Sequence, residues 1–166
     1  MKTLLILRHA KSSWKHAGLA DRDRPLNKRG QRQAPEIGKK IYKLGLTPDL
    51  ILCSPAKRAR DTAIPVAEKC GYDGDVEIVM DFYPGDVPQY IQVLSNLPEA
   101  VQRVMIVAHN PGLADLLAML IWRAETLSTA ALAQVEMPIE YWWQFDEDTR
   151  GKLVGIWRSE EVQESD

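Results

Sequence analysis

The chain has 166 residues, of which 45% are apolar and 27% are charged, and its formal net charge is -2. These proportions are typical of a globular protein; they exclude an intrinsically disordered chain, and no apolar run is long enough to span a membrane. The length predicts one domain, which we place at residues 1–158, with the polar and acidic residues 159–166 as a frayed tail. The apolar stretch at the start is too short for a signal peptide, so we expect a cytoplasmic protein.

Charge is distributed unevenly along the chain. Residues 1–60 contain 15 Lys and Arg but only 4 Asp and Glu, whereas residues 61–166 contain 6 and 19. Two interpretations remain open at this point: an anion-binding face, or opposite charges interleaved in the fold. Nucleic acid is not an expected partner, because the basic part lacks interleaved aromatic residues. Cys53 and Cys70 are too far apart for a zinc knuckle or a redox pair, and we expect two reduced, buried thiols.

Apolar runs of strand length alternate with helical patterns over the first 124 residues. Strands are predicted at 3–7, 49–53, 76–80 and 104–108, and helices at about 27–44, 55–70, 86–97 and 111–124. This alternation predicts an α/β fold: a three-layer sandwich whose central sheet is mostly parallel, with helices on both faces.

The pattern changes after residue 130. The runs at 131–137, 141–145 and 153–158 are predicted to form antiparallel strands, the last two joined by a turn at 146–151. Of the adjacent residues Trp142 and Trp143, one is expected in the core and the other on the surface, because neighbouring strand positions face opposite ways.

Polar segments follow three of the predicted parallel strands. Arg8 and His9 end the first strand, residues 54–58 follow the second, and residues 109–112 follow the strand at 104–108. Ligands of open parallel sheets bind beyond the carboxyl ends of the strands, so we expect these segments to converge.

Two of these segments also predict where helices begin. Ser54-Pro55 and Asn110-Pro111 each place a good N-cap residue before a proline at the first helical position. Helix N-termini present free backbone N–H groups and favour anions, so an anion is the expected ligand at this edge.

The side chains predicted there suit phosphoryl transfer. Arg8 and Arg58 carry the planar guanidinium that binds phosphate through two hydrogen bonds. A neutral His9 would attack phosphorus to give a phosphohistidine that water then cleaves, and His109 would stabilise the phosphoryl oxygens. No metal or cofactor is expected, because the arginines supply positive charge and a zinc site on the two histidines would lack a recognisable third ligand. A structural or surface role is the alternative for each histidine taken alone.

These motifs resemble those of the histidine phosphatase superfamily, which includes the phosphoglycerate mutases, and more closely its SixA-like phosphohistidine phosphatases. The match covers residues 4 to about 120: Leu7-Arg8-His9-Ala10 resembles Arg-His-Gly, residues 54–63 resemble Ser-Pro-x-x-Arg-Ala-x-x-Thr-Ala, residues 25–34 resemble Pro-Leu-Thr-x-x-Gly-x-x-Gln-Ala, and residues 108–110 resemble Gly-His-Asn. The resemblance implies His9 as the phosphate acceptor, Arg8, Arg58 and His109 as the phosphate pocket, and Ser12 as an additional contact.

The sequence also departs from the family pattern. Ala10 replaces the signature glycine, which requires ordinary backbone angles at that position. Many members carry a glutamate as general acid after the third strand, and here only Asp81 and Asp86 are candidates for that role. Imidazole is a better leaving group than an alkoxide, so a missing acid favours phosphohistidine over sugar phosphates as substrate. The short segment between Arg58 and His109 leaves no room for a cap domain, so the site should be open to a side chain of another protein.

The expected function is therefore dephosphorylation of phosphohistidine in a partner protein, which the basic N-terminal part would attract if the partner is acidic. Two alternatives remain: a phosphomonoesterase for a small phosphorylated metabolite, and a phosphoprotein-binding module without activity. Neither nucleic acid nor a membrane is an expected partner.

Overall fold

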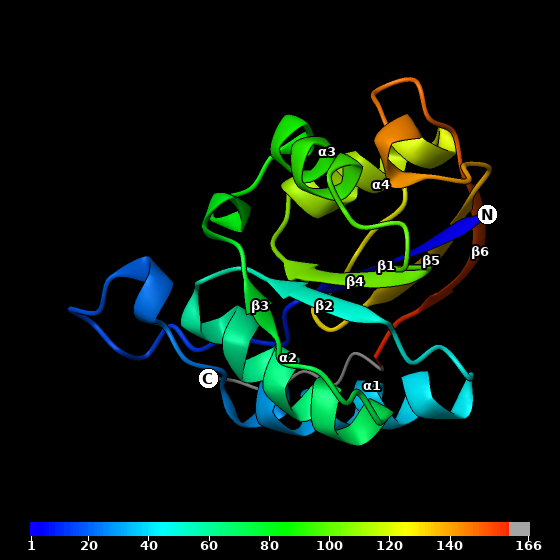
Figure 1. Cartoon of the computed structure of the whole chain (residues 1–166). Helices are drawn as coiled ribbons and strands as arrows, with labels where there is room; N and C mark the ends of the chain where they lie inside the picture. Colours follow the sequence, from blue (N-terminus) through cyan, green and yellow to red (C-terminus); the bar gives the residue numbers. More distant parts are fainter. Residues whose placement is uncertain (160–166) are drawn as a thin grey trace.

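A computed structural model describes residues 1–159, and its centre is a six-stranded sheet with the strand order β3-β2-β4-β1-β5-β6 (Figure 1). β1, β4, β2 and β3 run parallel, whereas β5 pairs antiparallel with β1 and β6. The strands and α-helices are β1 (Lys2–Arg8), α1 (Lys28–Lys43), β2 (Leu50–Cys53), α2 (Lys57–Cys70), β3 (Glu77–Ile78), α3 (Val87–Ser95), β4 (Arg103–Ala108), α4 (Gly112–Ile121), β5 (Leu132–Met137) and β6 (Lys152–Trp157). The predicted α/β class is confirmed.

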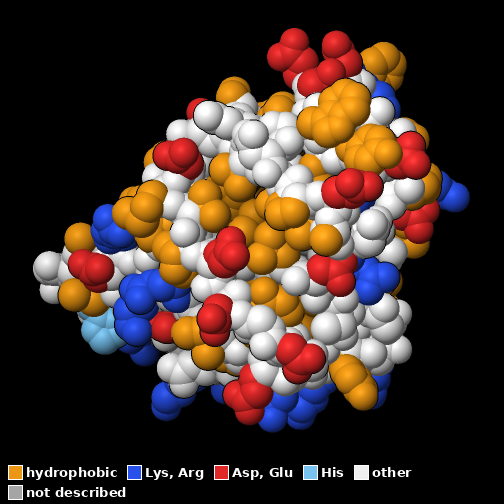
Figure 2. Space-filling model, viewed as in Figure 1, with side chains coloured by type: hydrophobic (Ala, Val, Ile, Leu, Met, Phe, Trp, Pro, Cys, Tyr) orange, Lys and Arg blue, Asp and Glu red, His pale blue; other side chains and the backbone are white. Residues whose placement is uncertain are grey.

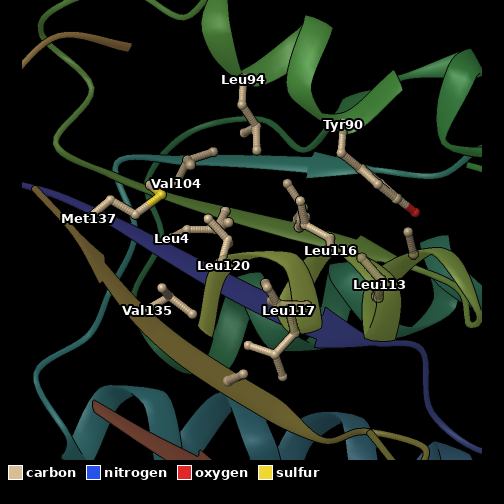
Figure 3. Packing of buried hydrophobic residues seen from close by; sticks show 14 of the residues in the cluster. Leu4, Tyr90, Leu94, Val104, Leu113, Leu116, Leu117, Leu120, Val135 and Met137 are labelled. Carbon is tan, nitrogen blue, oxygen red and sulfur yellow. The ribbon is translucent and has the colours of Figure 1, made fainter. Parts of the chain in front are cut away.

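Helices cover both faces of the sheet, with α1 and α2 on one side and α3 and α4 on the other (Figure 1). β1 shows why, because its side chains alternate between the two cores. Leu4 packs with residues of α3 and α4 (Figure 3), as does Ile6, and Leu5 and Leu7 pack with residues of α1 and α2. The middle of a central strand that is covered on both faces must be apolar on both, and residues 4–7 of β1 are all Leu or Ile.

The predicted strand at 141–145 is wrong. Its centre is a 3₁₀ helix, η3 (Trp142–Gln144), and β6 pairs with β5 instead. β5 already has β1 and β6 as its two neighbours, so no strand edge is left there for residues 141–145. Gln144 stabilises the turn, because its side-chain oxygen accepts hydrogen bonds from the backbone N–H groups of Glu140 and Tyr141.

The third predicted strand is shorter than expected. β3 contains only Glu77 and Ile78, both exposed at the edge of the sheet, and a 3₁₀ helix, η2 (Met80–Phe82), follows it. Phe82 is fully buried and anchors this turn in the core beside Tyr90. The chain after β3 therefore leads toward the core and not along the sheet.

The predicted tail is described only at its first residue. Ser159 accepts a hydrogen bond from Gln33 and donates one to the carbonyl of Thr129, while residues 160–166 lie outside the described part of the chain. No helix within residues 1–159 is both long enough and apolar enough to cross a membrane.

The two adjacent tryptophans should differ sharply in their effect on stability. Trp142 is 1% exposed and donates its indole N–H to the carbonyl of Val101, whereas Trp143 is 72% exposed. We expect Trp142→Ala to lower the free energy of unfolding by about 3–5 kcal/mol, because it leaves a large cavity. Trp143→Ala, the matched control, should cost less than about 1 kcal/mol. Urea denaturation measures both, and equal losses would contradict this account of the packing.

Candidate active site

The two histidines meet because their strands are neighbours in parallel register. Arg8, the last residue of β1, lies opposite Ala108, the last residue of β4. The residue that follows each strand is a histidine, His9 after β1 and His109 after β4. The backbone N–H of His9 donates to the carbonyl of Ala108, and the ring centroids of His9 and His109 are 5.2 Å apart. The side chains are 6% and 5% exposed, respectively. The convergence expected at the carboxyl edge of the sheet is present for both residues.

His9 is held with one ring nitrogen free for attack. Its Nδ1 lies 2.7 Å from the carbonyl oxygen of Ala10. Because a carbonyl only accepts, Nδ1 carries the hydrogen, and Nε2 of the neutral ring keeps its lone pair. Burial lowers the pKa of His9 to about 3, and the charges of His109, Arg58 and Arg8 add to this effect. The ring is therefore neutral at physiological pH and nucleophilic at Nε2.

His109 is oriented through Ser54. Its Nε2 lies 2.7 Å from the Ser54 hydroxyl oxygen, which also accepts the backbone N–H of Ala56. A serine hydroxyl can both donate and accept, so Ser54 holds the orientation of the His109 ring in either neutral tautomer. Nδ1 is buried and has no hydrogen-bond partner among the described residues. Burial, with Arg58 next in effect, lowers the pKa of His109 to about 4.

Both arginines are anchored at one end and unpaired at the other. Arg8 donates from Nη1 to the carbonyl of Leu127, and Arg58 donates from Nη1 and Nη2 to the carbonyl and carboxylate of Asp21. The Nε atom of each arginine is buried, with no acceptor in the part of the chain that the structure describes. Phosphate binds well to an Nε–H and Nη–H pair of one guanidinium. Three of the predicted residues, Arg8, Arg58 and His109, thus lie close enough to act electrostatically on His9, and the two arginines carry donors suited to an oxyanion.

The loop after β1 is tied to α2 through Thr62. The Thr62 hydroxyl accepts the backbone N–H of Ala10 at 2.9 Å and donates to the carbonyl of Arg58 at 2.7 Å. Ala10 does not adopt positive φ, so this position has no need of glycine's conformational freedom. Gly30 is different, because a Cβ atom there would lie 2.1 Å from the carbonyl oxygen of Lys11. The family glycine at the position of Ala10 is therefore dispensable, whereas Gly30 in the motif at residues 25–34 is required by close packing.

The two predicted N-caps are wrong, although α2 and α4 do begin at this edge. Ala56 and Pro111 occupy the N-cap positions, and neither makes a side-chain cap hydrogen bond. Ser54 orients His109 instead, and the side-chain amide of Asn110 donates to the carbonyl of Leu127, the oxygen that also anchors Arg8. Both side chains connect strand ends to other segments, which local sequence does not reveal.

The remaining predicted residues lie in different settings. Ser12 is buried, and its hydroxyl accepts a hydrogen bond from Arg24. Asp86 is the N-cap of α3, where its carboxylate accepts the backbone N–H of Gln89. Asp81 is exposed on η2. Asp86 thus has a structural partner, and a role of Asp81 or Asp86 as general acid stays a prediction.

The carboxylate at the site is that of Asp21, which the sequence interpretation did not identify. Besides its contacts with Arg58, it accepts the Tyr83 hydroxyl at 2.7 Å and Arg24 Nε at 3.1 Å. The Tyr83 hydrogen bond, followed by those of the arginines, lowers the pKa of Asp21 to about 2 despite partial burial. The Tyr83 ring also lies edge-on to His109, with centroids 5.6 Å apart. Asp21 is an anion at neutral pH and cannot serve as a general acid there.

No group of three or more His, Cys, Asp and Glu side chains within residues 1–159 gathers closely enough to hold a metal ion. Positive charge at the site comes from the guanidiniums of Arg8, Arg58 and Arg24. Both cysteines are free and buried.

Comparison with known proteins places the motifs in one family. Residues 4–82 match the histidine phosphatase superfamily (branch 1). An uncharacterised chloroplastic protein of Arabidopsis thaliana is 34% identical over 145 residues, which cover 80% of this chain and 66% of that protein. An uncharacterised protein of Mycobacterium tuberculosis is 32% identical over 114 residues, 69% of each chain. This chain belongs to the histidine phosphatase superfamily. It spans about two thirds of the length of these two relatives.

Solved structures place the fold in the SixA-like branch of the superfamily. SixA of Agrobacterium tumefaciens, provisionally assigned as a phosphohistidine phosphatase, is 26% identical with a TM-score of 0.82, and the match covers 95% of this chain and 98% of that one. A protein histidine phosphatase SixA in complex with tungstate has a TM-score of 0.79, with 93% and 95% of the two chains covered; at 24% identity it is a likeness of fold. Superfamily membership supports a phosphatase of the hydrolase class.

The protonation of the two histidines can be tested directly. Because the pKa values of His9 and His109 are lowered to about 3 and 4, both rings should stay neutral from about pH 8 down to about pH 5 and gain protons only below that range. NMR titration of the imidazole carbon-bound protons, assigned with His9→Gln and His109→Gln variants, measures this. A midpoint for His9 near the ordinary value of about 6.5 would contradict the effect of burial described here.

Proposed function

We propose that this chain is a metal-independent phosphatase that works through a covalent phosphohistidine on His9 and removes phosphate from phosphohistidine in a partner protein. One observation supports it above the others: beside a neutral His9, the buried Nε–H donors of Arg8 and Arg58 have no acceptor, and the buried Nδ1 of His109 has no partner, among the described residues. Buried donors are rarely left unpaired without a functional reason, and a tetrahedral oxyanion would supply the acceptors.

The first step transfers the phosphoryl group to His9. The lone pair of Nε2 forms a bond to phosphorus while the bond between phosphorus and the substrate imidazole breaks, and its electron pair stays on the substrate ring. If the other nitrogen of that ring carries a proton, the substrate leaves as neutral imidazole and needs no general acid. The charge spread over the phosphoryl oxygens is stabilised by the guanidiniums of Arg8 and Arg58 and by His109. The carbonyl of Ala10 accepts from Nδ1–H and steadies the positive charge of the phosphorylated ring.

The second step releases inorganic phosphate. A water oxygen bonds to phosphorus, the bond to Nε2 breaks, and its electron pair returns to the His9 ring, while both water hydrogens leave with the product as dihydrogen phosphate. The hydrogen of Nδ1 stays in place throughout because Ala10 holds it. The ring is thus regenerated in the tautomer with which it began, ready for another cycle.

A protein-borne phosphohistidine suits the chemistry of the site and its surface. Asp21, the carboxylate at the site, is ionised and cannot protonate an alkoxide leaving group. Lys and Arg side chains gather over the loop that carries a 3₁₀ helix, η1 (Asp21–Asp23), at the left of the molecule, and along α1 below it (Figure 2). Such a surface would attract an acidic partner, and salt would weaken the attraction. Similarity to the provisionally assigned phosphohistidine phosphatase of Agrobacterium tumefaciens also supports phosphohistidine as the substrate.

Replacing the nucleophile should abolish catalysis. We expect His9→Ala to lower the rate of phosphate release by at least about 10³-fold and to abolish acid-labile phosphate labelling of the chain, because no lone pair remains to accept the phosphoryl group. Single-turnover assays with labelled phosphohistidine protein measure both quantities. His16→Ala, an exposed histidine in the loop before η1, is the control and should behave like the wild type. Undiminished turnover by the His9 variant would overturn the mechanism.

Substrate choice needs a second measurement. We expect kcat/KM for a phosphohistidine protein to exceed that for phosphoserine peptides and sugar phosphates by at least about 10²-fold. The phosphate esters release an alkoxide, a poor leaving group that must be protonated. Side-by-side rates at matched salt give the ratio. A preference for one small phosphorylated metabolite would establish the phosphomonoesterase alternative. Phosphate binding without turnover by the wild type would establish the binding module.

A further inference from the structure

We infer that Asp21 is a positioning residue that holds the guanidinium of Arg58 in the orientation required for phosphate binding. The inference rests on the proposed function in one respect, because it takes Arg58 as a phosphate ligand. Asp21 is the first residue of η1, and its side chain is 49% exposed, so no requirement of the hydrophobic core explains its contacts.

The contacts of Asp21 occupy one edge of the Arg58 guanidinium and leave the other free. Nη1 donates to the backbone carbonyl of Asp21 at 2.7 Å, and Nη2 donates to its carboxylate at 3.0 Å. A guanidinium has a second two-donor edge, formed by Nε and the other hydrogen of Nη2. Nε of Arg58 is buried and unpaired among the described residues. Asp21 therefore fixes the plane and rotation of the group while leaving available the edge that binds an oxyanion.

Asp21 is itself held by two further segments of the chain. Tyr83, which follows η2, donates its hydroxyl to the carboxylate at 2.7 Å, and Arg24 donates from Nε at 3.1 Å. Arg24 is fixed in turn, since Nη1 donates to the Ser12 hydroxyl and the Ser13 carbonyl and its guanidinium carbon lies 3.5 Å from the centroid of the Trp14 ring. These contacts connect the loop after β1, the segment after η2 and the start of α2. The position of Arg58 thus depends on an ordered network around one carboxylate.

Two physical effects of Asp21 on phosphate binding have opposite signs. Its negative charge repels an incoming phosphate and competes for Arg58, so by charge alone its removal should tighten binding. Its orientation of Arg58 favours binding, because a mobile guanidinium must lose side-chain entropy to make two hydrogen bonds. The direction of the change on removing Asp21 therefore distinguishes a positioning role from a merely electrostatic one.

The experiment measures binding of inorganic phosphate by calorimetry, with kcat/KM as a second readout. We expect Asp21→Ala to weaken phosphate binding by about 10- to 100-fold and to lower kcat/KM in the same proportion. Asp21→Asn should weaken it by only about 3-fold, because the amide oxygen still accepts from Arg58. Asp23→Ala, in the same 3₁₀ helix and also exposed, is the matched control for removing an acidic charge from this loop and should stay within about 2-fold of the wild type.

The possible outcomes separate the hypotheses. Unchanged or tighter phosphate binding by Asp21→Ala would overturn the positioning role. If Asp21→Ala melts at a much lower temperature than Asp23→Ala, phosphate binding by Asp21→Asn decides between the two roles. Loss of charge alone would tighten phosphate binding by Asp21→Asn, whereas loss of a positioning contact would weaken it. Phosphate binding does not depend on turnover, so absence of phosphatase activity in the wild type would refute the proposed function and leave this inference to be judged on binding.

Discussion

Parallel pairing of β1 with β4, in a register that sets Arg8 opposite Ala108, is the constraint on which the site depends. It places His9 and His109 at the first position beyond each paired strand, with their rings in contact at 5.2 Å between centroids. A slip of one residue would turn the side chains of β1 to the opposite face of the sheet and exchange the two hydrophobic cores that Leu4 and Leu5 enter. Burial on both faces therefore maintains the register, and the register aligns the two histidines.

The electrostatic balance of the site explains how several basic side chains can share a buried region. The histidines avoid the cost of burying charge by staying neutral, with pKa values of about 3 and 4. The arginines cannot lose their charge, and each is compensated at one end, Arg8 by the carbonyl of Leu127 and Arg58 by Asp21. Their opposite ends stay uncompensated by the described residues. An arrangement of this kind gains stability when an anion enters, which is the physical basis for proposing phosphate as its ligand.

Some features were predictable because they follow from local pattern or from a general property of parallel sheets. Apolar runs identified β1, β2 and β4, and the rule that ligands bind beyond strand ends predicted that Arg8, His9, Arg58 and His109 converge. The prediction failed where side chains act over long distances in sequence. Ser54 and Asn110 have good N-cap chemistry but make contacts with other segments, and an aromatic run resembling a strand at 141–145 forms η3 because the sheet has no free edge beside β5. Asp21 was missed since 62 residues separate it from Tyr83.

By itself, the sequence determined the α/β class and the order of the elements up to α4, and it predicted the three groups, Arg8, Arg58 and His109, proposed to act with the candidate nucleophile, because hydrophobic periodicity and residue chemistry are local properties. Only the tertiary structure decided which ring nitrogen of His9 is free, which edge of Arg58 is occupied, and that the carboxylate of Asp21 belongs to the site. Those features depend on hydrogen bonds between segments that are distant along the chain, and such contacts exist only after the sheet register and the packing of α2 have brought the segments together.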